Sequence, residues 1–211
     1  SGSRGTRAAA PLLLSMHAQY PLSSHTVDSV IAHRRDGPVT TGRFFQDALD
    51  LAPALAAGGQ VLNTCHDRDL VAVGLGAALL AGKVTLMPSS FAPHTVAQLQ
   101  ARYAGLHCLH DGRDQAEGIA GLRVQDHLDI RAPAARSAPL VNADQVATTV
   151  FTSGSTGEPT AHDKTWGRLC INGAAEAERL GVSGMALVAT VPAQHMYGFE
   201  SSVLMALHGG A

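Results

Sequence analysis

The chain has 211 residues, of which 45% are hydrophobic and 15% are charged, and its formal net charge is −2. This length is sufficient for one domain with a large buried core, or for two small lobes. The near-neutral charge and the lack of a basic cluster exclude a typical nucleic-acid-binding module, which needs Lys and Arg to neutralise phosphates. Because no run reaches the roughly 18 apolar residues of a transmembrane helix, we expect no membrane span.

The N-terminal residues only partly resemble a secretory signal. Arg4 and Arg7 precede a short apolar run at 8–14, which contains a proline and has the minimum length for such a signal. We interpret residues 1–40 as a leader and N-terminal extension, partly disordered, with Met16 as a candidate natural start. Export through a signal peptide is the alternative.

The three cysteines indicate the cellular compartment. They are odd in number, widely separated and set in apolar runs, which is typical of buried cytosolic thiols and not of a disulfide framework. They are Cys65, Cys108 and Cys170. We therefore expect a cytoplasmic protein.

Residues 41–140 alternate between helical and strand periodicity, which predicts an N-terminal α/β lobe. Apolar side chains at helical spacing alternate with short β-branched runs, and Gly or Pro follows most of them. The expected elements are a helix at 41–57, a strand at 60–65, a helix at 67–81, a strand at 84–87, a helix near 96–103 and a strand at 106–109.

The pattern weakens from 111 to 142, where Pro133 and Pro139 indicate an exposed connection. A second block, residues 141–211, repeats the alternation. Its expected elements are a strand at 146–151, a long helix at 166–180, a strand at 186–191 and a helix at 199–207. Strands that alternate with helices predict an α/β fold with mostly parallel sheets flanked by helices.

A short run rich in Ser, Thr and Gly follows the strand expected at 146–151. Its members are Thr152, Ser153, Gly154, Ser155, Thr156 and Gly157. Glycines let the backbone approach oxygen atoms closely, and hydroxyl groups add hydrogen-bond donors, so this composition predicts a phosphate-binding loop. The run is not the G-x-x-x-x-G-K-[ST] motif, because no Lys-Ser or Lys-Thr pair follows it, and it is not the G-x-S-x-G nucleophile elbow.

Three segments resemble the adenylate-forming superfamily, which includes acyl-CoA synthetases, aryl-CoA ligases, peptide-synthetase adenylation domains and luciferases. The string 152–159 resembles its phosphate-loop signature, and 191–198 resembles its next core motif, in which a His lies beside the acyl-adenylate. Residues 61–88 resemble the opening strand–helix–strand of the N-terminal lobe. There we interpret Asp67 and Arg68 as a helix start and a surface charge.

The resemblance implies an ATP-dependent ligase that converts a small carboxylic acid to its acyl- or aryl-adenylate. The acyl group would then pass to a thiol, either of coenzyme A or of the phosphopantetheine arm of a carrier protein. The cofactors implied are ATP and Mg²⁺. Residues 152–157 would hold the β- and γ-phosphates and His195 would line the acyl pocket, while no residue of this chain is assigned to a metal.

The chain departs from the family in two respects. Thr160 stands where most relatives have a lysine after the loop proline, and we hypothesise that Lys164 reaches back to the phosphates instead. Relatives also continue well beyond the second motif, with adenine-, ribose- and magnesium-binding segments and a C-terminal domain that carries a lysine. The expected fold is therefore an incomplete N-terminal domain, with residues 141–211 as its truncated phosphate-loop segment. Such a chain would be inactive alone, and its uncovered surfaces predict self-association or a stable proteolytic piece.

Two other functions and one metal site are alternatives for this sequence. A degenerate adenylation domain would bind a nucleotide or a partner without turnover. A serine hydrolase would use Ser153 or Ser155 with His195, but the elbow and an acidic partner are lacking. Zinc binding by His107, Cys108 and His110 is not favoured, because neighbours in a strand point to opposite faces.

Overall fold

The structure is a computed structural model that describes residues 18–152 and 160–210. Its elements are β1 (Gln19–Pro21), β2 (Val30–Arg34), β3 (Gly37–Thr40), α1 (Thr41–Leu55), β4 (Val61–Asn63), α2 (Arg68–Leu80), β5 (Thr85–Met87), α3 (Pro93–Arg102), β6 (His107–His110), β7 (Ala120–Arg123), η1 (Val124–His127), β8 (Leu140–Asn142), β9 (Val146–Thr152), β10 (Thr160–Thr165), α4 (Trp166–Leu180), α5 (Met196–Gly198), η2 (Phe199–Leu204) and α6 (Met205–His208).

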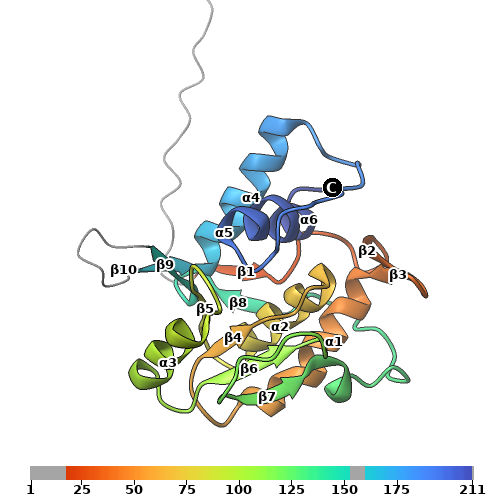
Figure 1. Ribbon diagram of the computed structural model, residues 1–211. Coiled ribbons are helices and arrows are strands. Elements are labelled where there is room, and N and C mark those ends of the chain that lie inside the picture. The colour runs from red at the N-terminus through yellow and green to blue at the C-terminus, as the bar shows by residue number, and fades with distance from the viewer. Residues whose placement is uncertain (1–17, 153–159, 211) are drawn as a thin grey trace, which may run out of the picture.

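A six-stranded sheet in the order β10-β9-β5-β4-β6-β7 forms the centre of the molecule (Figure 1). All neighbouring pairs are parallel except β10, which runs antiparallel to β9 at one edge. This sheet confirms the α/β fold expected from the sequence. It also joins strands from residues 41–140 with strands from residues 141–211. Two small antiparallel pairs, β1–β8 and β2–β3, lie outside it.

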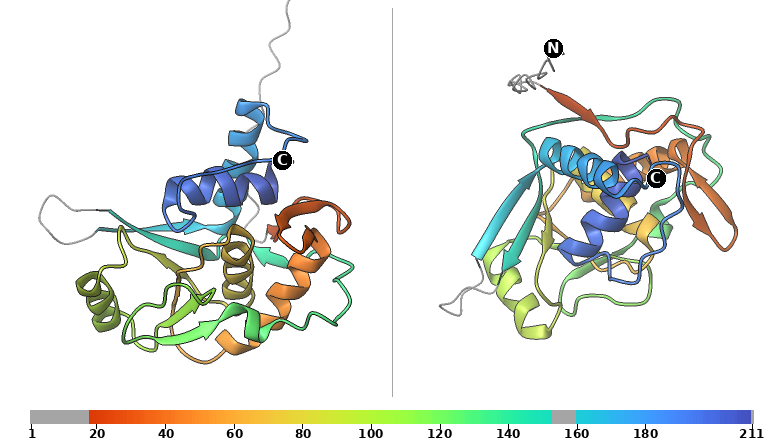
Figure 2. Two further views of the ribbon diagram at one scale, coloured as in Figure 1. Left: turned by 45° about the vertical axis from the view of Figure 1, so that its right-hand side comes forward. Right: turned by 90° about the horizontal axis from the view of Figure 1, so that it is seen from above.

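Helices cover both faces of the sheet (Figure 2). The larger apolar core lies on one face, beneath α1, α2, α4 and the C-terminal helices, and the smaller core lies on the other face, beneath α3. The strand residues alternate between the two cores: Val61 faces the larger core and Leu62 the smaller one. This alternation follows from the two-residue period of a strand and explains why the parallel strands are apolar on both faces.

Local signals fix the ends of two long helices. The Thr40 hydroxyl accepts a hydrogen bond from the Arg43 backbone N–H at 3.2 Å, which caps the start of α1. Helix α4 ends at Gly181, whose φ of 66° lies in the left-handed region that glycine adopts without steric cost. Both helices agree with the apolar spacing seen in the sequence.

Residues 23–25 contact the last helix, far away in the chain. The Ser23 hydroxyl donates to the Leu207 carbonyl at 2.7 Å, and the His25 Nε2 atom lies 2.9 Å from the Ala206 carbonyl. His208 is buried between Ser24, whose Oγ lies 3.0 Å from Nδ1, and Cys170, whose Sγ lies 3.4 Å from Nε2. This side of the larger core is therefore closed by two segments 184 residues apart.

One sequence-based expectation fails in the second block, and one strand was not expected. Residues 186–191 form no strand, and Val188 is 95% exposed. A strand needs a neighbour to satisfy its N–H and C=O groups, and no described strand lies beside this segment. Conversely, the polar segment Thr160–Thr165 forms the edge strand β10, which the sequence pattern did not reveal. None of the described helices is long and apolar enough to cross a membrane.

Candidate functional site

The candidate site lies at the carboxyl ends of the parallel strands. The chain runs from β4 to β5 on one side and later enters β6 on the other side of β4. The connections that follow β4 and β6 therefore leave in opposite directions. Such a reversal opens a crevice at the carboxyl edge of an open α/β sheet, where ligands bind. Strand β9 is parallel to β5, so Thr152 ends at this same edge.

A cleft of about 460 Å³ occupies this crevice. It is bordered by the loops that follow β4 and β6, by the start of α3 and by the segment that precedes α5. The lining residues that carry polar groups are Thr64, His66, Asp114, Gln115, Glu117, Gln194 and His195, and Phe91, Pro93, Val96 and Ala116 form the apolar wall. A cleft with an apolar wall and a few convergent polar groups is typical of small-molecule sites.

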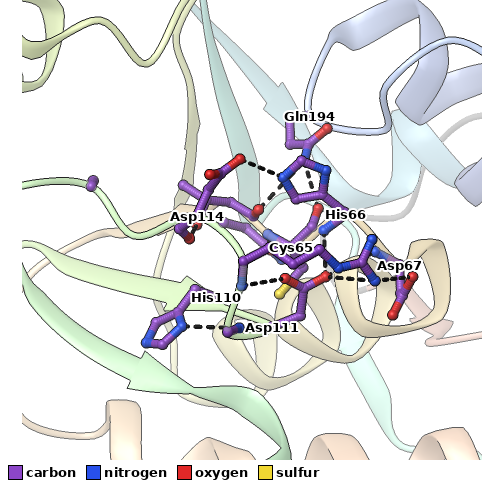
Figure 3. Close-up of polar contacts among 12 residues, drawn as sticks. Cys65, His66, Asp67, His110, Asp111, Asp114 and Gln194 are labelled. Atoms are coloured by element: carbon purple, nitrogen blue, oxygen red, sulfur yellow. Dashed lines mark hydrogen bonds and ion pairs between the residues drawn. The ribbon is translucent and has the colours of Figure 1, made fainter.

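Asp111 holds the two loops of the crevice together (Figure 3). Its buried carboxylate accepts hydrogen bonds from the backbone N–H groups of His66 at 2.8 Å, Asp67 at 3.2 Å and Arg113 at 3.3 Å. Burial by itself would raise the pKa of Asp111, but these three donors outweigh it and hold the pKa below its ordinary value. The carboxylate is therefore a structural acceptor that fixes the mouth of the cleft.

The His66 ring lies at the cleft, with its Nε2 atom 2.6 Å from Asp114 Oδ2 (Figure 3). Both side chains are substantially exposed, at 42% and 71%, so a ligand in the cleft can reach them. The sequence had offered no role for this pair, because the two residues are 48 positions apart.

The segment with His195 is fixed to the crevice by its neighbours. The Gln194 side-chain amide donates to the Cys65 carbonyl at 2.6 Å, and the Arg68 guanidinium donates to the Val191 carbonyl at 2.6 Å. Gly198 is required here, because a Cβ atom at this position would lie 2.2 Å from the Pro192 carbonyl oxygen. As a result the exposed His195 precedes α5 and lines the cleft.

Arg68 corrects one sequence-based interpretation. Helix α2 does begin at Arg68, after Asp67, but Arg68 is not a surface charge. It is half-buried and donates both to Val191 and to Ser202 Oγ, the latter at 3.0 Å. These contacts bridge more than 120 positions, so they could not be found from local periodicity.

Most of the expected phosphate loop lies outside the described residues. This applies to Ser153, Gly154, Ser155, Thr156 and Gly157. Thr152, the first residue of the expected loop, ends β9 with its side chain exposed, and its Oγ1 lies 3.3 Å from His162 Nε2 on β10. In the sequence, residues 153–159 therefore join two paired strands, β9 and β10, at the carboxyl edge of the sheet.

Lys164 lies at the other end of β10. Its register partner is Thr148, four residues before Thr152, which corresponds to about 13 Å along a strand. The pKa of Glu200 is raised, mainly by partial burial and to a smaller extent by the negative charge of Glu176. The positive charge of Lys164 lowers it slightly.

The histidines and the cysteine of β6 do not converge. Cys108 is buried in the smaller core, while the rings of His107 and His110 bond to the Ala57 carbonyl and the Gly112 backbone N–H. Across residues 18–152 and 160–210, no three His, Cys, Asp or Glu side chains are arranged to hold a metal ion.

Comparison with known proteins identifies the fold. No protein-family model and no curated protein matches the sequence. Among solved structures, the chain resembles o-succinylbenzoate CoA synthetase (MenE) from Bacillus subtilis in complex with its acyl-adenylate, OSB-AMP. The TM-score is 0.66 at 19% identity, and the match covers 91% of this chain and 55% of that chain.

Two further structures resemble it similarly. The N-terminal subdomain of NpsA from Klebsiella oxytoca, in complex with 3-hydroxybenzoyl-AMSN, has a TM-score of 0.61 at 18% identity, with coverages of 87% and 48%. McyG A-PCP, complexed with phenylalanyl-adenylate, has a TM-score of 0.64 at 17% identity, with coverages of 84% and 37%. The chain spans about half the length of the solved structures that it matches, or less. It has the fold of the N-terminal part of adenylate-forming enzymes.

Proposed function

We propose that this chain is the N-terminal part of an ATP-dependent carboxylic acid ligase that forms an acyl- or aryl-adenylate. The observation that carries the proposal is one of position. Strand β9 ends at Thr152, directly before the Ser/Thr/Gly-rich segment in the sequence, at the same sheet edge as the cleft lined by His195, and the fold is that of adenylate-forming enzymes.

In the proposed reaction, a carboxylate oxygen of the acid attacks the α-phosphorus of ATP, and the bond to the β-phosphate oxygen breaks. Pyrophosphate leaves, and a thiol of coenzyme A or of a carrier protein then displaces AMP from the acyl group. The protein's contribution is orientation and stabilisation of charge. Residues 152–157 hold the β- and γ-phosphates and the departing pyrophosphate, and His195 lines the acyl pocket beside the carboxylate.

The described residues at the base of the loop suit phosphate better than a metal ion. Thr152 and His162 present a hydroxyl and an imidazole, both of which can donate to phosphate oxygens. Asp163, the carboxylate on β10, is bonded to Thr149 Oγ1 at 2.7 Å on the opposite face of the strand. Since Mg²⁺ is commonly carried by nucleotide phosphates, the ion would be held chiefly through ATP.

Two finer assignments belong to the same proposal. The chain alone is inactive, because it spans only about half of the ligases that it resembles. The protein is cytoplasmic, which agrees with three cysteines that are all free and buried. Lys164 remains the sequence-based candidate for the missing loop lysine, although its register partner, Thr148, lies four residues before Thr152.

Calorimetric titration of the 211-residue chain with MgATP and AMP tests the binding step. Pyrophosphate release by the full gene product, assayed with a panel of aliphatic and aromatic acids, tests the reaction. We expect MgATP to bind and at least one acid to stimulate release. Binding without release with any acid would instead favour a nucleotide-binding module without turnover, for which Thr160 in place of lysine is the supporting observation.

A further inference from the structure

A second pocket lies beside α3, on the face of the sheet that carries the smaller core. We call it the α3 pocket, and it has a volume of about 330 Å³. Helix α3 forms one wall, and Phe151 of β9 and the residues that follow β5 form the other. It has no lining residue in common with the cleft that His195 lines, so the two are separate sites.

The apolar side of the α3 pocket is formed by Phe151 and Leu99, both of which belong to the smaller core. The Phe151 ring packs edge-on against Tyr103, with ring centroids 6.3 Å apart. Because core packing holds these side chains in place, the apolar surface is preformed. Such a surface suits an aromatic or aliphatic group of a ligand.

The polar side of the α3 pocket comes from one stripe of the helix. Thr95, Gln98 and Arg102 are three and four residues apart, so they lie on the same side of α3. Seven residues of helix correspond to about 10 Å, which places Thr95 and Arg102 toward opposite ends of the pocket. The Arg102 guanidinium carbon lies 5.6 Å from the centroid of the Tyr103 ring, a cation–π contact that restrains it.

Charge distinguishes the α3 pocket from the cleft. Among the described residues that line the pocket, Arg102 is the only charged one. No carboxylate within 18–152 and 160–210 forms an ion pair with it. The described lining of the cleft, in contrast, includes Asp114 and Glu117 but neither Lys nor Arg. A small organic anion is therefore attracted to the α3 pocket more strongly than to the cleft.

We propose that the α3 pocket binds a small monocarboxylate with an aromatic body. The aromatic ring packs against Phe151 and Leu99, and the carboxylate accepts two parallel hydrogen bonds from the planar guanidinium of Arg102. A hydroxyl group at the other end of the ligand meets the Thr95 hydroxyl. A single guanidinium matches a single negative charge. This inference goes beyond the proposed function and does not depend on it.

Calorimetric titration of the 211-residue chain tests the charge preference. The probes are 4-hydroxyphenylacetate, its neutral amide and the cation tyramine. We expect the carboxylate to bind about tenfold more tightly than the amide, the effect of one charge-assisted contact, and tyramine to bind most weakly. Arg102→Gln should raise the Kd for the carboxylate about tenfold and leave the Kd for the amide unchanged. Arg136→Gln, at an exposed arginine that does not line the pocket, is the matched control and should change neither constant.

A second pair of variants tests the location. Ala101 lines the α3 pocket and is exposed on the helix, so Ala101→Trp should fill the pocket without disturbing the core and abolish binding of both the carboxylate and the amide. Ala97→Trp, at another exposed position of α3 that does not line the pocket, should bind both as the wild type does. Photo-crosslinking with 4-azidophenylacetate should label the peptide that contains residues 88–102.

Each contrary result has a distinct meaning. Equal affinity for the carboxylate and the amide, or an unchanged Kd in Arg102→Gln, would overturn the role of Arg102 and with it the proposal. Labelling of residues 64–66 or 194–195 would place the carboxylate in the cleft and also overturn it. The proposed function has its own readout, pyrophosphate release by the full gene product, which Arg102→Gln should leave unchanged. Failure of one inference therefore leaves the other standing.

Discussion

Acidification should destabilise this protein through His208, and the structure gives the size of the effect. The ring is 6% exposed, lies between Ser24 and Cys170, and packs edge-on against Trp166 with ring centroids 5.2 Å apart. Burial, and secondarily the nearby His25, lowers the pKa of His208 from 6.5 to about 4. The folded protein therefore keeps this ring neutral at pH values where the unfolded chain protonates it.

The sign and magnitude follow from linkage. Between pH 6.5 and about 4 the unfolded state binds a proton at His208 that the folded state does not, so stability falls as the pH falls. Each pH unit of this interval costs about 1.4 kcal/mol, which gives about 3 kcal/mol for the whole interval. Above pH 6.5 the residue makes no pH-dependent contribution.

Urea denaturation at several pH values between 7.5 and 4.5 measures the effect. Other groups also titrate in this range, so the quantity of interest is the difference between the wild type and His208→Gln, with the exposed His94→Gln as a control. We expect the His208→Gln variant to be less stable than the wild type at pH 7.5, because its amide cannot reproduce the ring packing. On acidification, however, the variant should lose about 3 kcal/mol less stability than the wild type. Parallel curves for wild type and His208→Gln would refute the reasoning.

Three further predictions concern the site and the core. Arg68→Met should lower the free energy of unfolding by about 2 kcal/mol in urea titrations, because the Val191 carbonyl and the Ser202 hydroxyl lose the guanidinium donor. An unchanged free energy would show that water replaces these hydrogen bonds. Gly198→Ala should lower the free energy of unfolding by about 2–4 kcal/mol in the same titrations, because the added Cβ atom meets the Pro192 carbonyl oxygen. An unchanged free energy would mean that the turn before α5 relaxes freely. The thiols of Cys65, Cys108 and Cys170 should not react with a thiol reagent in the native protein but should react fully in urea. Burial shields all three and raises the pKa of Cys65 and Cys170, and rapid native labelling would contradict this.

Local sequence signals predicted the long helices and four of the parallel strands, but β7 was missed, because it lies in the stretch expected to be an exposed connection. Helix α4 and strand β9 appear where apolar spacing and β-branched residues placed them, because their burial follows directly from those patterns. Strand β10 was missed because it lies at the edge of the sheet and its sequence, Thr-Ala-His-Asp-Lys-Thr, is mostly polar. It pairs with β9 although it has no apolar pattern of its own.

The site was only partly visible in the sequence for a related reason. His195 could be singled out because it lies in a recognisable local motif next to Pro192. The partners that hold its segment, Arg68 and Gln194, act across more than 120 positions, through bonds to carbonyl groups that carry no sequence signature. The same holds for His66 and Asp114, which meet only because β4 and β6 are neighbours in the sheet.

The contacts between residues 23–25 and residues 206–208 also set an order of events during folding. Closing a segment of 184 residues costs about 5 kcal/mol of chain entropy, more than any one of these hydrogen bonds returns. The contacts therefore form after the sheet has already brought the two segments near each other. On the ribosome, residues 23–25 emerge long before their partners are synthesised. Until α6 leaves the exit tunnel, Trp166 lacks its edge-on contact with His208 and stays only partly covered.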